Sequence, residues 1–153
     1  MQFCYQKLKL IKEYVCNSLS GNKKLQEAVY YNNIDEVNEL INNKAFNNID
    51  CKDYGYEGAS PLMIACYFGY YELVKILIKN GANVNFNDDN NSSPITNAII
   101  QPNYITKNIW NSTKLKWEPK LQRIKKKPSI IIKILDELLK NGVDETKKEK
   151  ALY

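Results

Sequence analysis

The sequence contains no histidine among its 153 residues. Histidine is the commonest general base, so its absence removes Ser–His–Asp and Cys–His nucleophile chemistry. The four cysteines, Cys4, Cys16, Cys51 and Cys66, contain no C-x-x-C pair and lack the histidine that would complete a mixed zinc site. No Gly-rich phosphate loop or paired-carboxylate motif stands in their place. We therefore expect no catalysis, no metal and no cofactor.

Long apolar runs are also missing. No run approaches the roughly 18 apolar residues of a membrane helix, and lysine interrupts residues 1–10 too early for a signal-peptide core. A chain of this length with 44% apolar residues can bury an adequate core as one domain. We expect a single domain that does not enter a membrane and lies in the cytoplasm, of the producer or of a host cell.

Residues 53–88 carry a turn–helix–turn–helix pattern. Pro61 suits the first turn of a helix, Gly69 ends that helix, and Asn80-Gly81 ends a second one. The apolar positions of the second helix recur at helical spacing, at Leu73, Val74, Leu77 and Ile78. One such unit cannot bury its own apolar stripe, so it requires neighbours on both sides.

A neighbour is visible as a repeat. The stretch Pro61-Leu62-Met63-Ile64-Ala65 recurs 33 residues later as Pro94-Ile95-Thr96-Asn97-Ala98, which is the ankyrin period. The unit resembles an ankyrin repeat: it matches T-P-L-H-x-A at Ser60 to Ala65, the helix-ending glycine at Gly69, and the G-A-D-V-N loop at residues 81–85. The resemblance implies an all-α solenoid of helix-turn-helix units.

The chain divides into a capping helix and about three such repeats. Residues 1–21 show apolar spacings of three and four, so we assign an N-terminal capping helix that ends before Ser20-Gly21. Repeat one covers residues 22–52, repeat two 53–87 and repeat three 88–146, with a tail at 147–153. Superposing Ala28 on Ala65 aligns Asn32 with Gly69.

Three positions depart from the family pattern. Met63 and Thr96 replace the motif's histidine, so we expect its hydrogen bonds near the turn to be lost. Asn91 replaces a turn glycine, and asparagine tolerates a positive φ better than most residues.

Repeat three contains an insertion. Asn80-Gly81 recurs as Asn141-Gly142 after 61 residues, which leaves 28 beyond the period of 33 and places the surplus at about 101–128. This segment carries eight basic residues and one acidic residue, a net +7 in a chain of +5, and holds both tryptophans, Trp110 and Trp117. It could fold back onto the solenoid, dock on an acidic protein surface, or bind nucleic acid.

The resemblance also implies a binding surface. In the family, residues before the helix-ending glycine and at the loop tips line the concave face and contact partners. Four of the six helix positions carried over are aromatic, which suits a protein interface, although such rings could instead fill gaps between adjacent repeats. With the insertion, the candidate set is Tyr30, Tyr31, Tyr54, Tyr56, Glu57, Tyr67, Phe68, Asn87, Asp89, Asn90, Ile100, Trp110, Trp117, Lys125, Lys126 and Lys127.

The implied function is non-catalytic binding of another protein, one that could present an acidic surface. A small ankyrin-like chain works by occupying its partner, so we expect it to block that partner, as an immunity protein neutralises a cognate toxin. The alternative is a viral or bacterial ankyrin protein that captures a host factor. Nucleic acid ranks last among the three readings of the insertion, and a small molecule is not the partner we expect.

Overall fold

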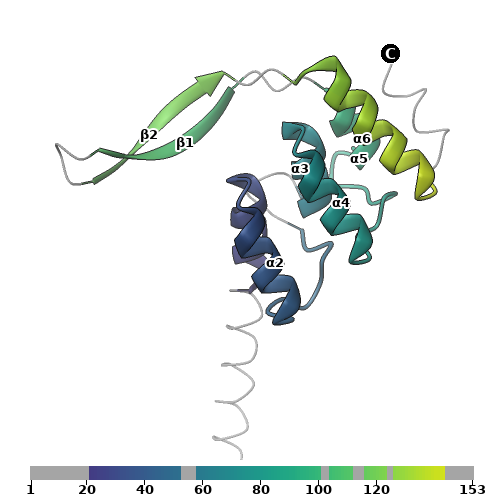
Figure 1. Cartoon of the computed structure of the whole chain (residues 1–153), viewed down its shortest axis with the longest axis horizontal. Helices are drawn as coiled ribbons and strands as arrows, with labels where there is room; N and C mark the ends of the chain where they lie inside the picture. The colour runs from purple at the N-terminus through teal and green to yellow at the C-terminus, as the bar shows by residue number, and fades with distance from the viewer. Residues whose placement is uncertain (1–20, 53–57, 101–103, 112–115, 124–125, 144–153) are drawn as a thin grey trace, which may run out of the picture.

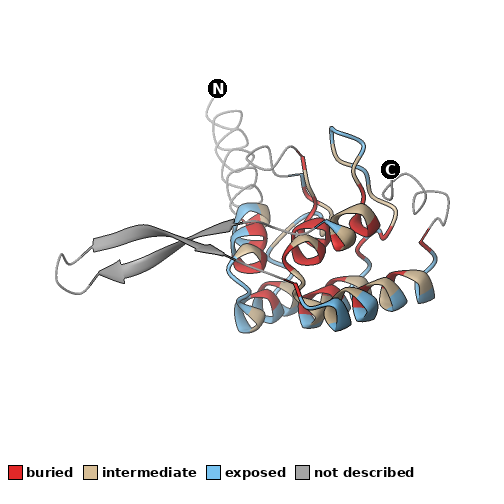
Figure 2. Ribbon diagram, turned by 90° about the horizontal axis from the view of Figure 1, so that it is seen from above, coloured by how far each residue is buried: buried red, intermediate tan, exposed pale blue. Residues whose placement is uncertain are grey.

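The protein is a helical repeat structure, described here by a computed structural model that covers residues 21–52, 58–100, 104–111, 116–123 and 126–143. Helices form two rows (Figures 1 and 2), and a pair of strands extends away from them (Figure 1). The expected N-terminal capping helix, apart from residue 21, and the tail at 147–153 lie outside the described residues.

Each repeat contributes one helix to each row. The inner row holds residues 21–30, α3 (Pro61–Phe68) and α5 (Pro94–Ile99). The outer row holds α2 (Ile34–Asn42), α4 (Tyr71–Lys79) and α6 (Pro128–Lys140). Helix α3 contacts α4 and α5, and helix α6 contacts the same two helices. Helices α5 and α6 therefore form the helix pair of repeat three, although 28 residues separate them in the sequence.

The core lies between the two rows. Its fully buried side chains come from every helix and are apolar, which is what the helical spacing of the sequence predicts. They include Leu25, Val29, Val37, Leu62, Leu73, Val74, Leu77, Ile95, Ile134 and Leu138.

The turns repeat the same geometry. Asn32 and Gly69 both have positive φ, at 56° and 76°, which confirms their predicted equivalence. Gly81 and Gly142, at 89° and 83°, close α4 and α6 in the same way. Asn91 also has a positive φ, 61°, as expected for a residue in place of a turn glycine. Glycine or asparagine, the residues that adopt a positive φ most readily, therefore occupies each of these turn positions.

The prediction about the motif histidine was wrong at one of its two positions. The Thr96 hydroxyl accepts a hydrogen bond from the backbone N–H of Ser93 and donates one to the Ser93 carbonyl, both at 2.8 Å. Threonine thus forms turn bonds of its own, whereas Met63 is buried in the core. Ser93 and Thr96 thus form a reciprocal hydrogen-bonded cap at the start of α5.

Gly21 is the first described residue of the chain and is tightly packed. It belongs to the helix of residues 21–30, and a Cβ placed on it would lie 1.7 Å from the carbonyl oxygen of Ala45. The glycine is needed because the backbone of a neighbouring turn packs directly against it.

The insertion forms a β-hairpin and does not fold back. Strands β1 (Tyr104–Asn111) and β2 (Lys116–Arg123) pair antiparallel, and Figure 1 shows them running away from the helices. The first of the three readings of this segment, packing onto the solenoid, is therefore wrong. In the described part of the chain, no helix is long and apolar enough to cross a membrane.

Candidate functional site

A row of aromatic side chains gathers where the inner helices of repeats one and two end. We define the aromatic row as Tyr30, Tyr31, Tyr67, Phe68 and Tyr70. Tyr30 lies edge-on to Tyr31 and to Phe68, with ring centroids 5.1 and 5.3 Å apart. Phe68 lies edge-on to Tyr67 at 5.0 Å and stacks on Tyr70 at 5.5 Å. The rings thus connect two repeats in one continuous cluster.

The members of the row differ in exposure. Tyr31 is 44% exposed, and Tyr30, Tyr67 and Tyr70 are half-buried. Phe68 is only 8% exposed, so it does not offer the contact surface that the sequence suggested. It is buried because rings from both repeats pack against it. Phe68 therefore fills the gap between the two repeats, whereas the Tyr31 ring is exposed at the surface.

Tyr70 and Tyr71 were not predicted as site residues. The Tyr70 hydroxyl donates to the carbonyl oxygen of Tyr30 at 3.4 Å and so ties the two repeats together. Burial, assisted by the nearby Tyr30, raises the pKa of Tyr70 to about 12. Tyr71 lies under two ammonium groups, with Lys75 at 5.4 Å and Lys133 at 5.8 Å from its ring centre. The pair of tyrosines directly after Gly69 was the signal that could have found them.

The base of the hairpin lies beside the aromatic row. Ile100, the last described residue before the insertion, is 48% exposed. Lys126 follows β2 and returns to the helices, where a Cβ placed on Gly69 would lie 2.8 Å from its Cγ. The aromatic row and the root of the insertion are therefore adjacent in space.

Lys126 itself is a correction to the predicted binding set. Its side chain is 4% exposed, and its Nζ donates to the carbonyl oxygens of Ala98 at 2.6 Å, Asn97 at 3.0 Å and Cys66 at 3.4 Å. Burial lowers the pKa of this ammonium to about 8. A buried lysine with three carbonyl acceptors is structural. Lys127 is exposed, and Lys125 lies outside the described residues.

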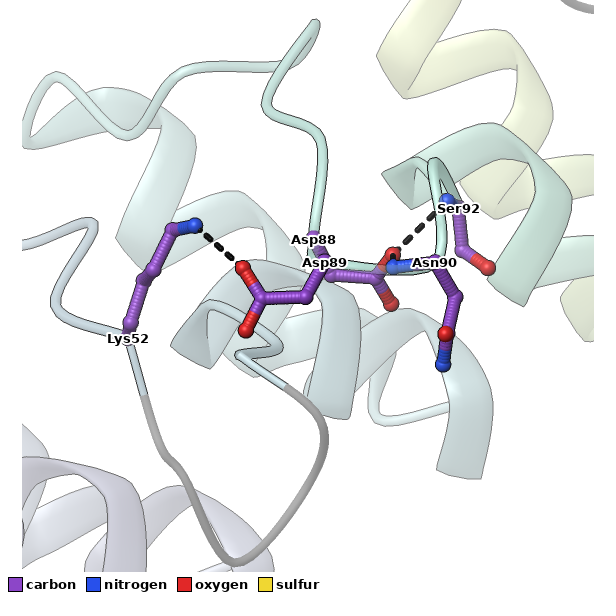
Figure 3. A network of polar contacts seen from close by, with 5 residues as sticks. All are labelled: Lys52, Asp88, Asp89, Asn90 and Ser92. Atoms are coloured by element: carbon purple, nitrogen blue, oxygen red, sulfur yellow. Dashed lines mark hydrogen bonds and ion pairs between the residues drawn. The ribbon is translucent and has the colours of Figure 1, made fainter.

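The loop tip between repeats two and three is exposed but internally bonded. One Asp88 carboxylate oxygen accepts from the backbone N–H groups of Asn90 at 2.9 Å and Ser92 at 2.7 Å (Figure 3). Asp89 forms an ion pair with Lys52 at 2.6 Å. Of the predicted tip residues, Asn87, Asp89 and Asn90 are exposed, whereas Tyr54, Tyr56 and Glu57 lie outside the described residues.

The two tryptophans are brought together by the hairpin register. Trp110 on β1 pairs with Trp117 on β2, next to the loop that joins the strands. Four of the segment's eight basic residues, Lys107, Lys116, Lys120 and Arg123, lie on the two strands. Sequence reasoning found the composition of this segment but did not find its strands.

The described part of the chain contains no group of three or more Cys, Asp or Glu side chains arranged to hold a metal ion. Cys51 and Cys66 are both buried. Burial raises the pKa of the Cys66 thiol to about 12, so the thiolate needed for nucleophilic attack is not available there.

Two rows of short helices, joined by left-handed turns and extended links, define a helical solenoid protein. The family model for ankyrin repeats, in three copies, matches residues 3–107. The chain belongs to the ankyrin-repeat family. A search among curated proteins found no match to this chain. Ankyrin repeats are generally protein–protein interaction modules and typically have no enzymatic activity.

Proposed function

We propose that this protein binds one partner protein along its aromatic row and the adjacent base of the hairpin, and that binding blocks the partner. The observation that carries the proposal is the continuous cluster of five rings across two repeats, of which Tyr31 is 44% exposed. Tyrosine supplies large contact area with few rotatable bonds and is over-represented among interface residues of high energetic weight.

The position of the row supports this surface over others. Ile100 is exposed at the end of α5, in the third repeat, so apolar surface is available at the equivalent end of each inner helix. A partner that contacted all three helix ends would also meet the root of the hairpin. The local excess of positive charge in the insertion favours a partner whose facing surface is acidic.

Blocking is favoured over scaffolding by size. A solenoid of about three repeats presents one compact surface, which suits occupation of a single site on a single partner. An immunity protein that neutralises a toxin acts in this way. Capture of a host factor by a viral or bacterial protein is the second candidate. Either activity would place the protein in the cytoplasm of the producer or of a host cell.

The surface is tested with the variants Tyr31→Ala and Tyr67→Ala, singly and combined. The full chain is immobilised, its partner is captured from the native cell and identified, and the affinity of the purified pair is measured. We expect the double variant to lose about 30-fold or more in affinity, which corresponds to about 2 kcal/mol.

The matched control is Ile132→Ala, because Ile132 is 59% exposed on α6, in the outer row. This variant should bind as the wild type does. Unchanged affinity in the tyrosine double variant would remove the aromatic row as the binding surface. Blocking is tested separately by measuring the partner's own activity, or its toxicity in cells, with and without the protein.

A further inference from the structure

The hairpin is a two-stranded sheet without a third strand in the described part of the chain. Among the described residues β1 and β2 pair with each other and with no further strand, and Figure 1 shows them projecting from the helices. A two-stranded ribbon in water is marginally stable, and its outer edges present unpaired backbone N–H and C=O groups. The ribbon therefore has two edges at which a further strand can add.

Proline makes those two edges different. In the observed register Pro119 of β2 lies opposite Asn108 of β1. Proline has no backbone N–H, and within sheets it occupies positions whose N–H would point away from the neighbouring strand. Pro119 therefore belongs to a pair that exchanges no hydrogen bonds across the ribbon. Because such pairs alternate along an antiparallel ladder, the same holds for Tyr104–Arg123, Thr106–Leu121 and Trp110–Trp117.

The backbone groups of these pairs point outward. On β2 the outward row includes Pro119, so the edge lacks a donor at its middle. On β1 the outward row is complete, with donors and acceptors at Tyr104, Thr106, Asn108 and Trp110. We call this row the β1 edge. It is the edge to which an extended chain of about seven residues can be added with unbroken hydrogen bonding.

We propose that the β1 edge takes an extended, acidic segment of the partner protein as a third strand. This inference rests on the proposed function, since it specifies how the hairpin holds the bound protein. The charge of the ribbon identifies the occupant. The two strands contain Lys107, Lys116, Lys120 and Arg123 against Glu118, a net +3.

The register sharpens the argument from charge. Lys107 lies directly opposite Lys120, and like charges at directly opposed positions destabilise a sheet. An added strand that places a carboxylate at this position relieves the repulsion. A second copy of the same ribbon would bring further lysines to it, so self-pairing is disfavoured. A nucleic acid has no peptide groups to match the alternating donors and acceptors of the β1 edge.

The probe is a synthetic ten-residue peptide that alternates valine and glutamate, titrated to millimolar concentration into the full chain. Both tryptophans of the protein lie on the ribbon. Their fluorescence therefore reports on the hairpin and not on the aromatic row, which contains no tryptophan. We expect a saturable change in tryptophan emission. The backbone amides of Thr106 and Asn108 should exchange with solvent at least tenfold more slowly in the complex.

Two variants form a matched pair. Thr106→Pro removes a donor from the β1 edge without removing a bond of the ladder, and Leu121→Pro does the same on β2. We expect Thr106→Pro to lose at least tenfold in peptide affinity and Leu121→Pro to bind as the wild type does. A peptide with lysine in place of glutamate should not bind.

Several results would overturn the inference. They are no binding of the acidic peptide, equal loss in both proline variants, no slowing of the Thr106 and Asn108 amides, or equal binding of the lysine peptide. Slowing of the same amides by a single-stranded oligonucleotide alone would assign the ribbon to nucleic acid. A dimer of the free chain that Thr106→Pro dissociates would assign the edge to a second copy.

The inference and the proposed function fail separately. If Thr106→Pro leaves the affinity for the captured partner unchanged while Tyr31→Ala with Tyr67→Ala reduces it, strand addition is wrong and the aromatic row stands. If Thr106→Pro reduces that affinity and the tyrosine variants do not, the β1 edge stands and the aromatic row is wrong.

Discussion

The Lys126 ammonium donates to the carbonyl oxygen of Ala98 at 2.6 Å and replaces a backbone bond that the other repeats make. In repeat one the carbonyl of Ala28 accepts from the N–H of Asn33 at 2.8 Å, and in repeat two that of Ala65 accepts from Tyr70 at 2.9 Å. Both bonds require a left-handed turn after the helix. In repeat three the chain leaves α5 through Ile100 in an extended conformation, with φ −61° and ψ 133°.

Because of the insertion, α5 lacks the backbone hydrogen bond that closes the inner helices of repeats one and two. A lysine at the end of the insertion donates the hydrogen bond that takes its place. The second strand of the insertion leads back to Lys126, which caps the carbonyl of Ala98 from a distance of 28 residues along the chain. The same ammonium also reaches the end of α3, at the carbonyl of Cys66. The hairpin is thus held at its root by a buried polar contact with two repeats.

Lys126→Met tests this role. Methionine keeps an apolar stem beside Gly69 but donates no hydrogen bond, so the carbonyls of Asn97 and Ala98 lose a donor. Unpaired buried carbonyls cost about 1–3 kcal/mol each, while removal of a buried charge offsets part of that cost. We expect a net loss of about 1 kcal/mol in the free energy of unfolding at pH 7, measured in urea, with faster amide exchange at Ile100.

The control for that variant is Lys127→Met, because Lys127 is exposed. It should change the free energy of unfolding by no more than about 0.5 kcal/mol. Equal effects of the two substitutions, or unchanged exchange at Ile100, would show that Lys126 does not hold the end of α5.

The stability of the wild type relative to Lys126→Met should rise between pH 7 and pH 9. Burial lowers the pKa of Lys126 from 10.5 to about 8, so above pH 8 the folded chain releases a proton that the unfolded chain still binds. The free energy of unfolding then increases with pH. Urea unfolding of both proteins across this range measures the difference.

The upper limit of that range matters because two other groups act in the opposite sense. Burial raises the pKa of Cys66 from 9.0 and of Tyr70 from 10.0, each to about 12. The unfolded chain loses these protons first, so above about pH 9 both groups lower the stability as pH rises.

A constant difference in the free energy of unfolding between wild type and Lys126→Met from pH 7 to pH 9 would contradict the assigned burial of Lys126.

Lys44→Gly should stabilise the protein. Lys44 follows α2 with a φ of 48°, and the next residue, Ala45, donates its N–H to the carbonyl of Leu40 at 3.0 Å. Gly81 and Gly142 hold the same place after α4 and α6. Because a lysine pays for the left-handed conformation and glycine does not, we expect a gain of about 0.5–1 kcal/mol in thermal or urea unfolding. Lys44→Ala, which keeps the Cβ, should give no gain.

Phe68→Ala and Tyr67→Ala should separate stability from binding. Phe68 is buried among rings of both repeats, so its truncation should cost about 3 kcal/mol in the free energy of unfolding. Tyr67 is half-buried. Its truncation should lower the free energy of unfolding by about 1 kcal/mol or less and should also reduce the affinity for the partner protein. Equal losses of stability would contradict the different burial of these neighbours.

Much of the solenoid could be predicted because its signals are local. Helical spacing of apolar residues selected the faces that form the core, and glycine or asparagine marked the left-handed turns. The period of 33 residues also exposed the insertion, since α6 could be recognised by its own ending at Asn141-Gly142. Each of these signals lies within one repeat or recurs at a fixed distance.

The hairpin was missed for a different reason. Residues 104–110 combine β-branched and aromatic residues, which is a strand signal, but the segment also carries a high density of lysine, which is depleted in strands. A proline within a run also argues against a central strand, whereas in the observed register Pro119 pairs with Asn108 in a ribbon whose two strands are both edges. Pairing of two segments, not propensity of either one, decides such a structure.

The sequence by itself determined an ankyrin solenoid with a basic, tryptophan-bearing insertion in its third repeat. Only the tertiary structure decided that Phe68 is interior, that Tyr31 is exposed, and that Lys126 is a structural cap and not a binding residue. The reason is physical: burial and the donor that satisfies a carbonyl depend on which elements meet in space. Cys66 and Lys126, 60 residues apart, meet at the end of α3.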